Sequence, residues 1–164
     1  MILRSVIRLL LCTAILPTAA QAGDFPQIAF IAMGYAELTR DALPPDGHQQ
    51  RRMADQTGFL AITADLNGDG RDDEVRILAN SDRGDAHVVA VIQSPDQIDT
   101  YVLNSLSFAD RGQMGIQIAP PTPSQGQSRP HIVLFRFDGP AECLVFQGKE
   151  FEQVPMPADW TLPN

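Results

Sequence analysis

The sequence predicts a mainly β protein: antiparallel sheet, arranged as a blade-like meander or a small sandwich, with a short helix near the N-terminus. Short apolar stretches rich in β-branched residues recur from Gly58 to Val154, and turn residues separate them at short intervals. Several stretches also alternate apolar with polar side chains. This pattern is typical of an antiparallel all-β domain rather than of helices alternating with parallel strands.

Composition limits the class of protein. The chain has 164 residues, 44% of them hydrophobic, and its formal net charge is −8. One globular domain with a buried core fits these values, whereas a wholly disordered chain, a coiled coil and collagen do not. The acidic balance also argues against a nucleic-acid-binding protein, because basic residues supply most of the affinity for the phosphate backbone.

Residues 1–22 have the pattern of a secretory signal peptide. Arg4 and Arg8 form a positive region before an apolar run, Leu9–Leu16, and Ala-Gln-Ala at 20–22 is a small-x-small cleavage pattern. The run is shorter than the ~20 residues of a membrane-spanning helix. Cleavage after Ala22 removes two arginines and no acid, so the charge becomes −10. We therefore expect a periplasmic or secreted protein without a membrane anchor.

The segment 23–56 is predicted to be helical and loop-like. Asp24 is a suitable N-cap, and the chain breaks at Pro44–Gly47. The polar stretch Gln49–Arg52 is expected to be a solvated face or a loop. Apolar residues recur at helical spacing after the cap: Phe25, Ile28, Ile31, Ala32, Tyr35 and Leu38.

The rest of a single domain, 23–164, is predicted to consist of strands. The Pro-rich segment 120–130 is interpreted as a long exposed loop, because the residues after it are too few for a core of their own. Cleavage removes Cys12, so Cys143 is expected to be a buried residue in a strand without a disulfide. The predicted strands are 59–64, 73–79, 87–93, 100–103, 114–119, 132–137, 143–146 and 151–154.

An acidic turn between the first two strands carries the main functional prediction. Oxygen-bearing side chains occupy its positions 1, 3 and 5, namely Asp65, Asn67 and Asp69, and a glycine occupies position 6. Position 7, Arg71, needs to offer only its backbone carbonyl, and Asp73 at position 9 can close the ring. Calcium takes six to eight oxygen ligands from flexible loops of this kind, so the spacing predicts a calcium site.

The turn differs from an EF-hand. Arg76 stands where the bidentate Glu belongs, Asp72 replaces an apolar residue, and strands rather than helices flank the loop. The segment from Asp65 to Asp73 instead resembles the calcium loop Asp-x-Asn-Gly-Asp-Gly-x-x-Asp of FG-GAP/VCBS repeats. These are the β-propeller repeats of integrin α-chains and of many exported bacterial proteins. One copy is found, over about 20 residues.

The resemblance implies calcium ligands at Asp65, Asn67, Asp69, Asp73 and, through its carbonyl, Arg71. A metal-free hairpin turn is the alternative, since Asn-Gly and Asp-Gly are common turn dipeptides. A bare turn would, however, crowd carboxylates without a cation, and magnesium fits such a flexible loop less well than calcium. We therefore expect a structural Ca²⁺ site.

No catalytic residue is predicted from a motif. His48, His87 and His131 have no zinc-ligand spacing, and the latter two are expected to be surface or edge histidines. The tripeptide 83–85, Arg-Gly-Asp, is interpreted as part of a hairpin turn rather than as an adhesion motif. The leading hypothesis is a non-enzymatic, calcium-stabilised binding or accessory protein of the cell envelope, whose acidity favours a basic partner.

The alternative hypothesis is a metal-dependent hydrolase. In that case the carboxylates beside the loop, Asp72, Asp73 and Glu74, carry the reaction. It predicts a pocket next to the loop, a metal-bound water and a carboxylate with a raised pKa.

Overall fold

The protein is mainly β, with two antiparallel sheets and a few short helices, as the sequence predicts. A computed structural model describes residues 27–45, 47–121 and 128–163. The predicted signal peptide, its cleavage site and Asp24 lie outside these ranges, as do residues 122–127 of the predicted loop. Within the described ranges, no helix has the length and apolarity needed to cross a bilayer.

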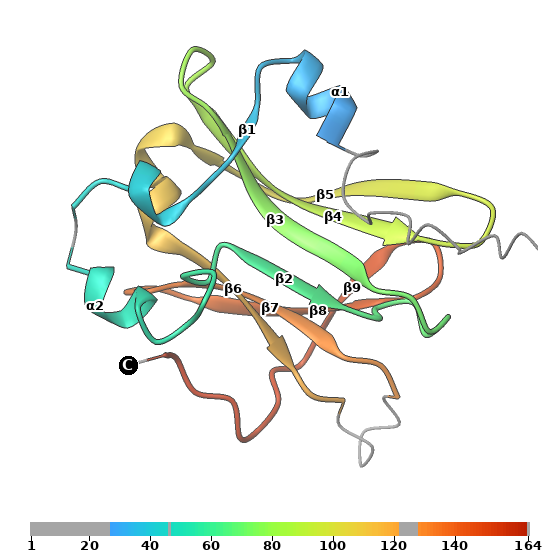
Figure 1. Ribbon diagram of the computed structural model, residues 1–164. Coiled ribbons are helices and arrows are strands. Elements are labelled where there is room, and N and C mark those ends of the chain that lie inside the picture. Colours follow the sequence, from blue (N-terminus) through green and yellow to red (C-terminus); the bar gives the residue numbers. More distant parts are fainter. Residues whose placement is uncertain (1–26, 46, 122–127, 164) are drawn as a thin grey trace, which may run out of the picture.

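All eight predicted strands are present (Figure 1). Some are extended by a few residues, and the first is shorter than predicted and begins at Ala61. The short pairing segment β1 was not predicted. The elements in chain order are α1 (Gln27–Ala32), β1 (Ala36–Glu37), η1 (Arg40–Ala42), α2 (Gln49–Arg52), β2 (Ala61–Ala64), β3 (Asp73–Asn80), β4 (Asp85–Gln93), β5 (Ile98–Ser107), η2 (Phe108–Gln113), β6 (Met114–Ala119), β7 (His131–Arg136), β8 (Ala141–Phe146) and β9 (Phe151–Val154).

The first sheet, sheet A, is built around β3. Both β1 and β2 pair with the same side of β3, since Glu37 lies opposite Leu78 and Ala61 opposite Arg76. On its other side β3 pairs with β4, and β4 pairs with β5. The second sheet, sheet B, is a meander in the order β6-β7-β8-β9. The amide of Ile116 in β6 donates to the carbonyl of Phe59 at 2.8 Å and so joins sheet B to the segment just before β2.

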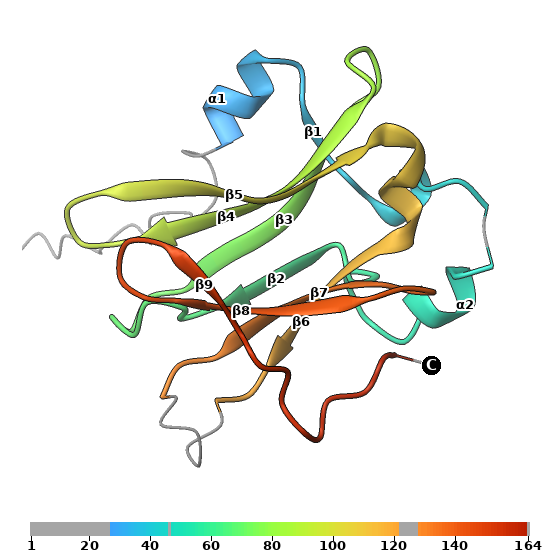
Figure 2. The same cartoon turned by 180° about the vertical axis from the view of Figure 1, so that it is seen from behind.

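The two sheets face each other across the main core (Figures 1 and 2). Because side chains alternate along a strand, each sheet sends every second residue into this core. Sheet A contributes Val75, Ile77, Val88, Ala90 and Ile92, and sheet B contributes Ile116, Ile132, Leu134, Leu144 and Phe146. The molecule is therefore a sandwich, one of the two predicted arrangements.

Both outer faces of the sandwich are also partly covered. Phe30 of α1 packs on a buried cluster that includes Leu78 and Val89 of sheet A. On sheet B, Trp160 of the C-terminal segment packs against Phe135, and its indole N–H donates to the side chain of Gln117 at 3.1 Å. Because the outer faces are partly covered as well, strands of both sheets contain nearly continuous runs of apolar residues.

The N-terminal helix is shorter than its apolar spacing predicts. Gly34 adopts a φ of 84°. Its amide donates to the carbonyl of Ile31 at 2.8 Å, and the amide of Tyr35 donates to the carbonyl of Phe30 at 2.9 Å. These two bonds make a Schellman motif, which ends a helix. Tyr35 and Leu38 consequently follow the helix as extended, buried residues instead of belonging to it.

Two polar residues expected at the surface are buried. Arg52 of α2 is 2% exposed, which corrects the prediction that Gln49–Arg52 is a solvated face. Its guanidinium donates to the carbonyls of Gly58, Gly112 and Met114 at 2.7, 2.5 and 3.0 Å. His131 at the start of β7 is fully buried rather than at an edge. Cys143, in contrast, is buried in β8 as predicted.

Candidate metal centre

The predicted metal loop connects β2 to β3, and the side chain of Asp65 shapes it. One carboxylate oxygen of Asp65 accepts the amide protons of Gly68 at 2.6 Å and of Asp69 at 3.1 Å, and the other accepts that of Gly70 at 2.9 Å. Gly68 and Gly70 have φ values of 80° and 83°, in the left-handed region that glycine adopts without steric cost. The backbone therefore curls around the first predicted ligand.

Asn67 and Asp69 extend this bonding along the loop. The side-chain oxygen of Asn67 accepts the amide of Asp69 at 2.9 Å, and a carboxylate oxygen of Asp69 accepts the amide of Arg71 at 2.9 Å. The side-chain nitrogen of Asn67 donates to the carbonyl of Gln93 at 2.8 Å, at the end of β4. The side chain of Arg71 is exposed, in keeping with a role through its backbone carbonyl alone.

Asp73, the last predicted ligand, is fully buried. One of its oxygens accepts the amides of Leu66 at 2.8 Å and Asn67 at 3.2 Å, and the other accepts the amide of Gln93 at 2.8 Å. Burial raises the pKa of Asp73, and these three amide bonds offset only part of that rise. The carboxylate thus ties the beginning of the loop to β4 from the first position of β3.

The structure brings the five predicted residues together on one loop, but their acidic side chains do not converge. In the described part of the chain, no three Asp, Glu, His or Cys side chains form a group that could hold a metal. The donor set itself suits calcium, because it consists of oxygens only and a carboxylate has lone pairs beyond those that the amides use. Asp69 is exposed and bonds the loop through one of its two oxygens.

Two neighbours of the loop were not predicted from the sequence. A Cβ added at Gly68 would lie 3.3 Å from Nε of Arg129, so this guanidinium packs against the acidic loop. Arg129 also donates to the carbonyl of Phe146 at 3.0 Å, which ties it to β8. Gln93 participates only through its backbone. Neither contact leaves a signal in the sequence, since both residues are distant from the loop along the chain and come next to it by folding.

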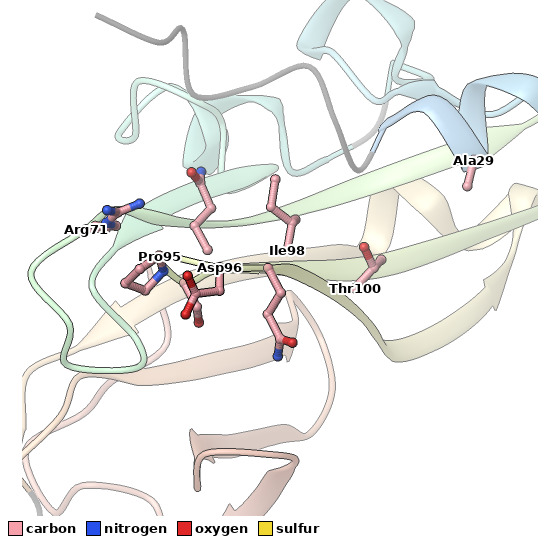
Figure 3. Close-up of a pocket in the computed structure, with 9 residues that line it drawn as sticks. Ala29, Arg71, Pro95, Asp96, Ile98 and Thr100 are labelled. Carbon is pink, nitrogen blue, oxygen red and sulfur yellow. The ribbon is translucent and has the colours of Figure 1, made fainter.

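A shallow pocket of about 620 Å³ lies beside the loop (Figure 3). Arg71 marks its end at the loop, Pro95 and Asp96 of the β4–β5 turn lie along it, and Ala29 of α1 marks the far end. One cation and one anion in its lining make it polar without a strong field of either sign. Among the residues described, none of the proposed hydrolytic carboxylates lines it.

The carboxylates of the hydrolase hypothesis lie in three different environments. Asp72 is exposed, whereas Asp73 is buried and accepts hydrogen bonds from backbone amides. The carboxylate of Glu74 forms an ion pair with the guanidinium of Arg76 at 2.8–2.9 Å. A general acid and base must reach a common substrate atom, and none of these three side chains lines the pocket beside the loop. The geometry of the loop therefore favours a structural role.

Compared with known proteins, the chain matches no family model, no curated protein and no solved structure.

Proposed function

We propose that the protein is an exported β-sandwich stabilised by one calcium ion, and that it acts by binding a partner. The predicted ligands are Asp65, Asn67, Asp69, Asp73 and the carbonyl of Arg71. The observation that carries the proposal is the buried Asp73 carboxylate, whose three hydrogen-bond donors are all backbone amides. A cation at the loop would offset the cost of keeping this negative charge out of water.

In this proposal the calcium ion supplies electrostatic stabilisation and no chemistry. Asp65 and Asn67 already order the loop, and Asp73 ties it to the end of β4. An ion held by the same residues would fix the connection between three strands of sheet A. At a free calcium concentration about 100 times the dissociation constant, binding adds about 2.7 kcal/mol to the stability of the fold. The resemblance to FG-GAP/VCBS loops supports the same structural role.

The proposed partner is a basic protein of the cell envelope or of the external medium. The signal-peptide pattern directs the chain to that compartment, and a charge of −10 after cleavage favours association with a positively charged surface. This part of the proposal is tested by affinity capture from envelope extract with calcium or with EDTA. Enrichment of basic proteins is the expected result, and capture of no protein under either condition would contradict it.

Isothermal titration calorimetry tests the calcium site directly. We expect about one Ca²⁺ per chain, little heat with Mg²⁺, and a melting temperature several degrees lower in EDTA. Asp69→Ala should abolish the binding heat, whereas Asp82→Ala, which removes an exposed acid from the β3–β4 turn, should retain it. Absence of calcium heat with the parent chain, together with equal melting in calcium and EDTA, would refute the proposed site.

A further inference from the structure

Four side chains that are scattered in the sequence meet on the outer face of sheet A, away from the metal loop. The hydroxyl of Ser105 on β5 lies 2.9 Å from Nδ1 of His87 on β4, its partner in the strand register. Nε2 of His87 lies 3.1 Å from the hydroxyl of Tyr35. That hydroxyl lies 2.8 and 2.9 Å from the two carboxylate oxygens of Asp85. The four groups form one continuous hydrogen-bonded chain.

The donor and the acceptor of each of these hydrogen bonds follow from the carboxylate of Asp85. A carboxylate only accepts, so Tyr35 donates its single proton to Asp85. Burial and then the bond to Asp85 raise the pKa of Tyr35, which keeps the phenol protonated. The Tyr35 oxygen can then only accept from His87, which places the ring proton on Nε2 and leaves the lone pair of Nδ1 to accept from Ser105.

The imidazole is also fixed in place by aromatic rings. The centre of the Tyr35 ring lies 5.2 Å from that of the His87 ring, and the centre of the Phe30 ring lies 6.2 Å from it. The side chain of His87 is 19% exposed, whereas Ser105 at the other end of the chain is exposed. The base is therefore held rigidly inside the cluster, and the hydroxyl that it can deprotonate faces solvent.

We propose that Ser105 is an activated nucleophile for acyl transfer, with His87 as its general base and with Tyr35 and Asp85 as positioning residues. A serine hydroxyl becomes nucleophilic when an adjacent base takes its proton, and a third group must orient that base. Here the Tyr35–Asp85 pair orients the imidazole through Nε2. This site lies on different residues from the calcium loop and goes beyond the proposed binding function.

The surroundings of Ser105 indicate the class of substrate. The hydroxyl of Ser105 lies on the outer face of sheet A, on the side of His87 and away from sheet B, because the two residues are opposite each other in the strand register. The cluster itself holds the carboxylate of Asp85, and the whole chain is acidic, so the local charge is negative. Anionic substrates are disfavoured by this field, and the site is suited to small uncharged esters.

The reaction balances with water as the only co-reactant. The Ser105 oxygen forms a bond to the acyl carbon while its proton passes to Nδ1 of His87. The bond from the acyl carbon to the alcohol oxygen then breaks, and the alcohol leaves with that proton. Water repeats the sequence on the acylated serine, so that ester and water become carboxylic acid and alcohol.

An uncharged alkyl fluorophosphonate tests the proposal on the full chain. The serine oxygen bonds to phosphorus, the P–F bond breaks, and fluoride leaves. Peptide mass spectrometry should find the adduct on Ser105, formed on the order of 100-fold faster than on the exposed Ser81 of the β3–β4 turn, because general-base catalysis contributes ~10²–10⁴-fold. Ser107, whose hydroxyl lies 3.0 Å from a carboxylate oxygen of Asp110 and not beside an imidazole, is the control on the same strand.

Variants separate the roles within the cluster. Ser105→Ala should remove the fast adduct, and His87→Gln should reduce labelling to the rate of Ser81. Tyr35→Phe keeps the ring but interrupts the chain to Asp85. It should lower the maximal labelling rate at least about tenfold, leave the half-saturating probe concentration unchanged, and flatten the dependence of the rate on pH. Labelling of Ser105 at the rate of Ser81 in the folded parent chain, verified by circular dichroism, would overturn the proposal.

Discussion

The buried carboxylate of Asp73 accepts the backbone amide of Gln93 at 2.8 Å, which joins the first residue of β3 to the last residue of β4. The other oxygen of Asp73 accepts two amides from the start of the acidic loop. A single side chain thereby satisfies three backbone donors, of which that of Leu66 is buried and those of Asn67 and Gln93 are partly buried. The loop is consequently part of sheet A and not an appendage to it.

Replacement of this carboxylate should be costly even without a metal. Asp73→Ala leaves one buried and two partly buried amides without acceptors, at ~1–3 kcal/mol for each group that water cannot reach. We expect a loss of about 3 kcal/mol in the free energy of unfolding, measured by urea denaturation in EDTA. Asp72→Ala, at the exposed neighbouring position, should change it by less than about 0.5 kcal/mol. Equal losses in the two variants would show that the buried bonds contribute nothing.

The left-handed conformation of Gly68 should have a measurable effect on the free energy of unfolding. Gly68 has a φ of 80°, and a Cβ there would meet Arg129 at 3.3 Å. Gly68→Ala should therefore destabilise the fold by about 1 kcal/mol, since an L-residue is strained in the left-handed region. Gly47→Ala is the matched change: it has no atom within 4 Å of the added Cβ and no left-handed φ. Chemical denaturation should find it neutral or slightly stabilising, and the reverse order would be inconsistent with this geometry.

Adjacent arginines of α2 should differ strongly in their contributions. Arg52 is buried, bonds three carbonyls and lies 4.6 Å above the ring of Phe137. Arg51 is about one-third exposed and bonds the carbonyl of Phe137 and the exposed Asp138. Arg52→Ala should lower the melting temperature by ~10 °C, as expected for a loss of about 3 kcal/mol, and Arg51→Ala by far less. Similar melting curves for the two variants would contradict this assignment.

The burial of His131 predicts a pH dependence. Burial lowers the pKa of His131 below its ordinary value of 6.5, and the nearby backbone of Pro120 opposes this shift only in part. The unfolded chain therefore binds a proton more readily than the folded one. The stability of the fold should be complete above pH 6.5 and should fall as the pH decreases towards the lower folded pKa, by at most about 1.4 kcal/mol per pH unit from this group.

His131→Leu removes that contribution. Unfolding free energies measured from pH 8 to pH 5 should show a smaller loss on acidification for this variant than for the parent chain. The comparison isolates His131 from the other histidines, which are present in both proteins. Parallel pH profiles would mean that the folded and unfolded states bind the proton equally.

The strands could be predicted from the sequence because their signal is local. Alternation and β-branched runs located eight of the nine strands in the described residues, and its small size and apolar neighbours explain why Cys143 was correctly expected in a buried strand. The acidic loop was also located correctly, since the spacing of Asp65, Asn67 and Asp69 depends only on the loop itself. Whether it holds calcium stays a prediction. The predicted helix was too long, because Tyr35 and Leu38 fit a helical period by chance whereas Gly34 ends the helix.

By itself the sequence determined the class of the fold, the order of its strands and the position of the acidic turn, because neighbours along the chain decide these features. Only the tertiary structure decided that the sheets form a sandwich, that Arg52 and His131 are buried, and that Arg129 packs against Gly68. It also decided that Ser105 and His87 share a hydrogen bond with Tyr35 and Asp85 nearby. These contacts join residues far apart in sequence, and their partners are fixed by strand register and sheet packing, which leave no periodic trace in the chain.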